Sequence, residues 1–172
     1  MRTEQKTVAL GAVTGAVLMV ASVCILTMLL PAPLLADAVA ERLAYALRAN
    51  AFAMLPLVMM FIVIAKQRFF SDAIDPTRHV ESRALEINRR VASNTLEQNF
   101  VFVVASLAMS TVVPTNRVQV VWAAAIVFVI ARVAFWVGYR INPPYRAAGM
   151  SATALVSLGM ILYVGFHVIA GE

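Results

Sequence analysis

Five apolar runs place the strongest constraint on how this chain can fold. A transmembrane helix needs roughly 20 consecutive, mostly apolar residues. Such runs extend approximately from Val8 to Leu30, Ala49 to Ala65, Asn99 to Val113, Val118 to Tyr139 and Met150 to Ala170. With 62% hydrophobic and 13% charged residues among 172, the composition lies outside the range of ordinary soluble domains. We therefore predict an all-α integral membrane protein with five spans.

Three of these runs need comment. The first follows a short basic start, as in a signal peptide, but its 23 residues exceed the roughly 7 to 15 of a signal sequence, so we predict an uncleaved membrane helix. The second contains Pro56, which predicts a kink or a site packed by a neighbour. The third is short, and we predict that its helix starts near Glu81, because residues 81–98 include good helix formers and neither Gly nor Pro.

The basic residues predict an orientation. Outside the spans they fall into two groups, and cytoplasmic segments carry an excess of Lys and Arg. The +5 charge then reflects topology and gives no reason to expect nucleic-acid binding. We expect a bacterial inner membrane protein with the N-terminus in the cytoplasm and the C-terminus outside. The cytoplasmic group is Arg2, Lys6, Lys66, Arg68, Arg78, Arg83, Arg89, Arg90, Arg140 and Arg146, and the opposite group is Arg42, Arg48 and Arg117.

Polar residues at helical spacing lie where the third span enters the membrane. Arg90, Asn94 and Glu97 are separated by four and three residues, so they project from one stripe of a helix. Such a polar stripe is unfavourable on a helix face that contacts lipid, so it indicates a site for a polar ligand. Asn94 and Glu97 could also form interhelical hydrogen bonds without a ligand, and Arg90 could simply be a positive-inside residue.

The fourth span carries a second stripe, formed by Arg132, Phe135 and Tyr139. Arg132 lies roughly 10 Å from the predicted cytoplasmic end of its helix, where an unpaired guanidinium is costly. We expect Glu97 to be its ionic partner, because both residues lie just inside the same membrane boundary. The Asn-Pro-Pro sequence that follows should end this helix and place Arg146 in the first turn of the next one.

The remaining reactive residue types give little indication of a site. Cys24, the only cysteine, is predicted to be a small buried apolar residue. His79 and His167 have no Cys or Asp cluster beside them, so no metal site is predicted.

Two sequence segments resemble a known family. "RVASNTLE" resembles the Arg-x-x-x-Asn-x-x-Glu motif of the MAPEG family, the membrane-associated proteins of eicosanoid and glutathione metabolism. "ARVAFWVGYRINPPYR" is similar to the third-helix segment of its leukotriene-forming glutathione conjugases. The resemblance covers approximately residues 48–170 and implies a four-helix membrane domain over 48–172. Residues 1–47 would add an extra transmembrane helix and a loop, an arrangement that resembles the five-helix, mattrin-like branch of the family.

The resemblance also implies a site for glutathione as co-substrate. Arg90, Asn94 and Glu97 would hold the peptide, and Arg132 and Tyr139 would line the same pocket. Arg146 matches the arginine that activates the thiol. Family members are homotrimers with sites between subunits, and Lys66 roughly matches a basic residue that the neighbouring subunit donates.

The chemistry of glutathione fits these residue types. Its two carboxylates need arginines, its ammonium needs a carboxylate and its thiol needs a nearby cation that favours the thiolate. Phe135 and Gln98, however, stand where the leukotriene-forming enzymes have tyrosines. We therefore retain two hypotheses: a glutathione transferase or peroxidase acting on lipophilic electrophiles, and a non-catalytic membrane module that binds a protein partner or lipid.

Overall fold

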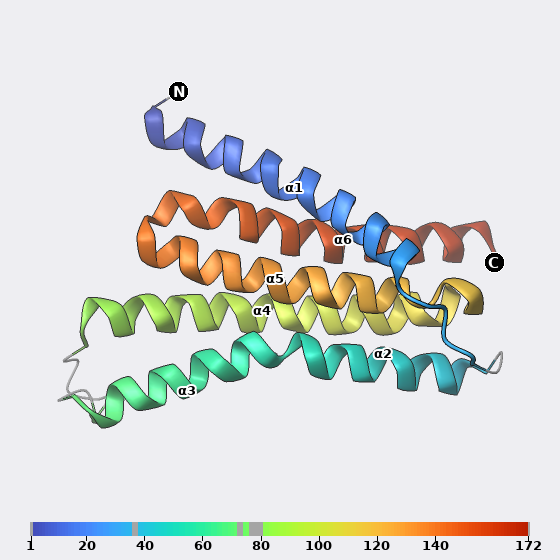
Figure 1. Ribbon diagram of the computed structural model, residues 1–172, viewed down its shortest axis with the longest axis horizontal. Helices are drawn as coiled ribbons and strands as arrows, with labels where there is room; N and C mark the ends of the chain where they lie inside the picture. The colour runs from blue at the N-terminus through green and yellow to red at the C-terminus, as the bar shows by residue number, and fades with distance from the viewer. Residues whose placement is uncertain (1, 36–37, 72–73, 76–80, 172) are drawn as a thin grey trace.

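The computed structural model describes residues 2–35, 38–71, 74–75 and 81–171. Pro76, Arg78, His79 and Glu172 lie outside the described residues. The described chain is helical, without strands, and Figure 1 shows its helices in chain order. These are α1 (Thr3–Leu29), α2 (Val39–Ala53), α3 (Leu55–Phe69), α4 (Arg83–Val112), the short η3 (Thr115–Arg117), α5 (Val120–Ile141), the short η4 (Pro143–Arg146) and α6 (Ala147–Ala170).

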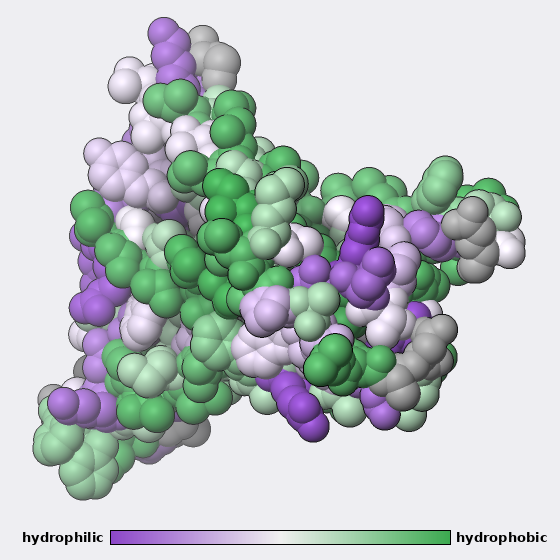
Figure 2. Space-filling view, turned by 45° about the vertical axis from the view of Figure 1, so that its right-hand side comes forward, coloured by the Kyte–Doolittle hydropathy of each residue, from purple (hydrophilic) through white to green (hydrophobic). Residues whose placement is uncertain are grey.

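Five helical segments of the described chain are long and apolar enough to cross a membrane, which confirms a multi-pass integral membrane protein. α2 and α3 together form one of these segments, Val39–Phe69. The two ends of the chain lie at opposite ends of the bundle (Figure 1), as an odd number of spans requires. Hydrophobic side chains cover long continuous stretches of the surface seen in Figure 2, as expected for a protein surrounded by lipid.

Pro56 divides the second span. It follows the first residue of α3 and is buried, and α2 and α3 meet at Met54. Proline lacks the amide N–H that would continue the helical hydrogen-bond ladder and its ring clashes with the preceding turn, which accounts for the break. α2 begins ten residues before the predicted start at Ala49. The prediction began too late because it counted only apolar residues, and the first part of α2 contains charged ones.

α4 begins close to the predicted position. Ser82 caps it, with the side-chain oxygen accepting a hydrogen bond from the Leu85 amide at 3.2 Å. Further along, the buried Asn88 donates to Gln67 on α3 and accepts from the indole N–H of Trp136 on α5, both at 2.8 Å. These hydrogen bonds connect α3, α4 and α5. They contribute to helix association in a membrane, where apolar side chains gain little by leaving lipid for protein.

Two glycines bring α5 and the chain that follows it into close contact. A Cβ on Gly138 would lie 2.7 Å from the Tyr145 carbonyl oxygen of η4. A Cβ on Gly149 of α6 would lie 2.5 Å from the Phe135 amide nitrogen of α5. Glycine is therefore required at both positions for the backbones to approach this closely.

α1 packs mainly against α6, which starts at the same end of the bundle (Figure 1). A Cβ on Gly15, the one buried residue of the fully described α1, would clash with the Ala148 carbonyl group. The Ser151 hydroxyl donates to the Ala12 carbonyl oxygen at 2.8 Å. Cys24 is exposed on α1, so the expectation that it is buried is wrong, because most of α1 faces outward.

Most of the described basic residues gather at the two ends of the bundle. One end, hereafter the basic end, combines the start of α1, the end of α3, the start of α4 and the α5–α6 connection (Figure 1). Arg42 and Arg117 lie at the other end. The division of the chain after residue 47 remains a prediction; that residue lies inside α2.

Candidate functional site

A cavity of about 300 Å³ opens among α4, α5 and α6 at the basic end. Four of its six lining residues belong to the predicted glutathione site, although they come from three separate elements. The lining residues are Arg90 and Asn94 from α4, Phe135 and Tyr139 from α5, Arg146 from η4 and Met150 from α6. The structure thus brings two residues from each of the two predicted stripes to one cavity: Arg90 and Asn94 from the first, Phe135 and Tyr139 from the second.

Arg146 is held at the edge of this cavity by the turn between α5 and α6. Asn142 ends α5, and the short helix η4, which begins with two prolines, positions Arg146 directly before the first residue of α6. Its guanidinium lies over the Tyr139 ring, 4.7 Å from the ring centroid. The start of α6, as the positive end of a helix dipole, adds partial positive charge at the same place. An anion in the cavity would meet both.

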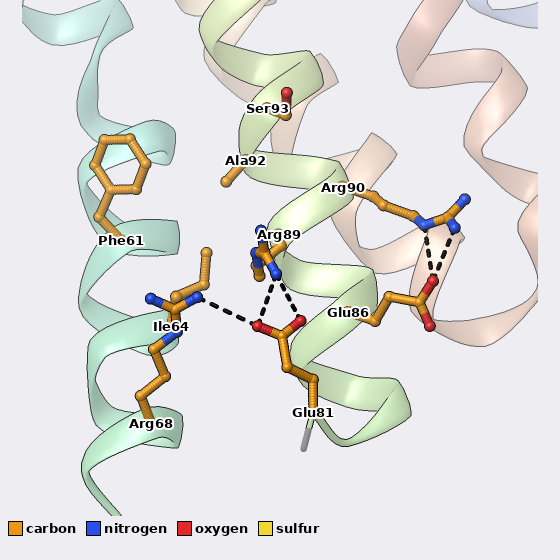
Figure 3. A pocket seen from close by; sticks show the side chains of 9 residues that line it. All are labelled: Phe61, Ile64, Arg68, Glu81, Glu86, Arg89, Arg90, Ala92 and Ser93. Atoms are coloured by element: carbon orange, nitrogen blue, oxygen red, sulfur yellow. Dashed lines mark hydrogen bonds and ion pairs between the residues drawn. The ribbon is translucent and has the colours of Figure 1, made fainter. Parts of the chain in front are cut away.

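Arg90 is already paired within α4. Its Nη2 lies 2.8 Å from Glu86 Oε1, and its Nε donates to the same oxygen at 3.1 Å (Figure 3). Glu86 was not among the predicted site residues, although its spacing of four residues before Arg90 is the usual signal for such a pair. The pair is exposed and worth little energetically, so a ligand carboxylate can compete for the guanidinium.

Arg132 lies behind the cavity wall, with none of its surface exposed. Its Nη1 donates to Asn94 Oδ1 at 2.9 Å, and its Nη2 donates to the Gly149 carbonyl oxygen at 3.4 Å and to the Thr153 hydroxyl. The guanidinium also lies 4.5 Å from the centroid of the Phe135 ring. Arg132 therefore orients two residues of the wall, Asn94 and Phe135, without lining the cavity itself.

The expected ion pair between Arg132 and Glu97 is wrong. Glu97 is exposed on α4 and makes no ion pair or hydrogen bond within the described chain. The Arg132 guanidinium bonds instead to Asn94, which lies one turn earlier on the same stripe, while the Glu97 side chain is at the exposed surface of α4. Neutral dipoles and an aromatic face surround the buried charge instead of a carboxylate.

We expect Thr153→Val to destabilise the protein by about 2 kcal/mol, because it removes a hydrogen bond to the buried charge of Arg132 while preserving side-chain shape. The free energy of unfolding in mixed micelles measures this effect. Ser157→Ala is the control, since the Ser157 hydroxyl is buried one turn later without a partner in the described chain and its loss should cost little. Equal destabilisation by both variants would contradict the role given to Thr153.

Three other residues of the predicted site region lie outside the cavity. Lys66 is exposed near the end of α3, and Glu97 and Gln98 do not line the cavity. Within one chain the structure therefore assembles Arg90, Asn94, Tyr139 and Arg146 but not Lys66 or Glu97.

A second cavity, of about 620 Å³, lies between α3 and α4. Glu81 accepts hydrogen bonds from Arg89 at 2.7 Å and from Arg68 at 3.3 Å across it (Figure 3). These bonds, that with Arg89 above all, lower the pKa of Glu81 below its usual value. The network links the end of α3 to the start of α4, and neither Tyr139 nor Arg146 reaches this cavity.

Met150 and Thr153 escaped sequence reasoning altogether. Met150 lines the cavity and Thr153 supports it from behind. A methionine in an apolar helix carries no signal of a site. A threonine in a membrane span does signal an interhelical hydrogen bond, and that signal was available.

The fold and the cavity together define a class of protein: a helical integral membrane protein with a cationic, partly aromatic cavity built from three helices at one end of its bundle. A sequence profile of the MAPEG family matches residues 7–166. The chain belongs to the MAPEG family, and the match includes α1 as well as the four spans that follow it.

Two relatives share the name transmembrane protein 79. The protein from Bos taurus is 24% identical over 132 residues, covering 77% of this chain and 33% of the relative. The protein from Mus musculus is 23% identical over 132 residues, covering 77% of this chain and 34% of the relative. This chain therefore spans about a third of the length of these relatives.

Proposed function

We propose that this protein binds glutathione in the cavity among α4, α5 and α6 and acts as a glutathione transferase or peroxidase on lipophilic electrophiles. One observation carries the proposal: Arg90, Asn94, Tyr139 and Arg146, which are 56 residues apart along the chain at the extremes, line one cavity. The cavity, of about 300 Å³, lies at the lower limit of the volumes usual for small-molecule sites.

The chemistry of each residue supports the assignment. Arg90 can exchange Glu86 for a glutathione carboxylate, and Asn94, fixed by Arg132, can bond to the peptide. Arg146 and the start of α6 favour the thiolate, which is the nucleophilic form of the sulfur. The thiol proton passes to water. The thiolate sulfur then bonds to the electrophilic carbon as the bond from that carbon to its leaving group breaks, or attacks a hydroperoxide oxygen as the O–O bond breaks.

Phe135 favours a second candidate function, a non-catalytic membrane module that binds a protein partner or lipid. Its ring contacts Arg132 and Tyr139 but offers no hydroxyl to a ligand. The module would keep the fold and the cavity without activating the thiol. The thiol pKa of bound glutathione separates the two functions, because only the first requires it to fall.

We further propose a homotrimer in a bacterial inner membrane, with the basic end in the cytoplasm. Glu97 is exposed among apolar neighbours such as Phe100, and an exposed carboxylate beside lipid is costly. A neighbouring subunit that covers this face of α4 would remove that cost and could supply Lys66 to the cavity. The basic residues at one end support the orientation.

Calorimetric titration of the purified protein with glutathione tests the proposal directly. We expect binding, and we expect Glu97→Gln to weaken it about tenfold. Glu97 does not line the cavity within one chain, but in the proposed trimer, where a neighbouring subunit covers this face of α4, its carboxylate would pair with the ligand ammonium. Glu41→Gln, at the other end of the bundle, is the control and should leave the affinity unchanged. Absence of glutathione binding by the wild-type protein would overturn the proposed function, and equal affinity of the Glu97 variant would remove that residue from the site.

A further inference from the structure

A larger cavity lies on the α1 side of Arg146. It has a volume of about 870 Å³, is open to the outside, and lies between the first part of α1, the turn after α5 and the first part of α6. Arg146 and Met150 line both this cavity and the one among α4, α5 and α6. The two cavities therefore meet at the residue proposed to hold the thiolate.

The lining of this α1 cavity changes in character with depth. Polar side chains surround its mouth at the basic end, namely Glu4, Gln5, Asn142 and Arg146. Its deeper part is mainly apolar: Val8, Ala9, Ala12, Met150 and Ala154 line it, together with Ser151, whose hydroxyl is bonded to the Ala12 carbonyl oxygen. α1 and α6 start at the same end of the bundle, so residues further along either helix lie further from the basic end. From Glu4 to Ala12, α1 rises by about 12 Å, which is comparable to the length of an extended nine-carbon chain.

We infer that the α1 cavity binds the aliphatic part of the second substrate, a lipid-like electrophile whose reactive carbon lies beside Arg146. This inference rests on the proposed function, because the sulfur of glutathione defines where the two substrates meet. It assigns to α1 a task in substrate selection: one wall of the apolar cavity consists of α1 residues, and without them this face of α6 would be open to lipid.

The close packing of α1 supports a built cavity and not a chance gap between helices. Gly11 and Gly15 allow α1 to touch Ala147 and Ala148, and Ser151 bonds to the α1 backbone at 2.8 Å. These contacts fix α1 against α6 beside the cavity. Val8 and Ala12 can then present their side chains to an aliphatic chain, whose burial is favourable in proportion to the apolar area covered.

Two stable glutathione thioethers test the inference without any reaction. S-methylglutathione probes the peptide site alone, and S-nonylglutathione adds a nine-carbon chain at the sulfur. Calorimetry in lipid nanodiscs, corrected with empty nanodiscs, should show the nonyl compound binding about tenfold tighter or more. Ala12→Trp should fill the cavity, lowering affinity for the nonyl compound about tenfold while changing affinity for the methyl compound less than about twofold.

Matched variants keep the result interpretable. Ala21→Trp makes the same substitution at an exposed position of α1 that does not line the cavity, and it should change neither affinity. Val8→Trp, at a position with 43% of its surface exposed, should reproduce the selective loss even if Ala12→Trp displaces α1. Equal affinities of the wild-type protein for the two compounds, or equal effects of the Ala12 and Ala21 variants, would overturn the inference alone. Failure of both compounds to bind would overturn the glutathione site and the inference with it.

Discussion

Arg146→Ala is expected to slow the conjugation of glutathione to a generic electrophile by about 10²-fold, equivalent to about 2.7 kcal/mol of transition-state stabilisation. The reason is geometric: Arg146 lies over Tyr139 at the edge of the cavity and immediately before α6. In the proposed complex its charge would act mainly on the thiolate and less on the bound peptide, which Arg90 and Asn94 would still contact. Steady-state kinetics measure the loss of rate, and ultraviolet absorption of the bound thiolate measures the change in the thiol pKa.

The sign of the accompanying pKa change follows from the same charge. A cation stabilises the thiolate, so the pKa of bound glutathione should lie below that of a free thiol, about 8.5, and Arg146→Ala should raise it. Arg140→Ala is the control, because Arg140 is also basic and lies at the same end of the bundle but does not line the cavity. Identical behaviour of the two variants, or bound glutathione with an unlowered thiol pKa, would remove the catalytic role of Arg146 and leave the non-catalytic module.

Gly149→Val is expected to destabilise the protein by about 3 kcal/mol through overpacking. The first carbon of any side chain at this position would clash with the Ala131 carbonyl oxygen and lie 2.5 Å from the Phe135 amide nitrogen. Both contacts are with α5 backbone, which cannot rotate away as a flexible side chain can. The variant should therefore force α5 and α6 apart and disturb the cavity, and unfolding in mixed micelles measures the loss of stability.

Gly159→Val provides the control within the same helix. A Cβ on Gly159 meets no atom of the described chain within 4 Å, so the substitution should change the free energy of unfolding by well under about 1 kcal/mol. Similar destabilisation by both valines would mean that helix propensity, and not the α5–α6 contact, dominates the effect.

Hydropathy was sufficient to predict the five spans, because the bilayer sets a minimum apolar length that few other folds require. It was insufficient for α2, whose first ten residues are helical although they include Arg42 and Arg48. Hydropathy also did not predict which helices α1 packs against. A helix that is apolar on every side carries no periodicity to show which face meets protein, and α1 contacts α6 through glycines and small residues that hydropathy does not distinguish.

The Glu97 prediction shows why depth alone cannot identify ion pairs in a bundle. Arg132 and Glu97 were matched by their distance from one membrane boundary, which hydropathy estimates well. Depth does not show which polar group lies within hydrogen-bonding distance: Asn94 bonds to Arg132, whereas Glu97 is exposed on α4. The spacing of the motif was more informative, because Arg90, Asn94, Tyr139 and Arg146 do line one cavity.

The pairing of the first helix with the last has a consequence for biosynthesis. About 118 residues separate the end of α1 from the start of α6, so at about 5 to 20 residues per second the ribosome needs about 6 to 24 s to deliver the main partner of α1. During this interval α1 must reside in the bilayer largely surrounded by lipid. α1 is apolar on all sides and has a single buried residue, Gly15, so it can remain in lipid without its partner at little cost. Closure of the α1 cavity should therefore be among the last events of assembly.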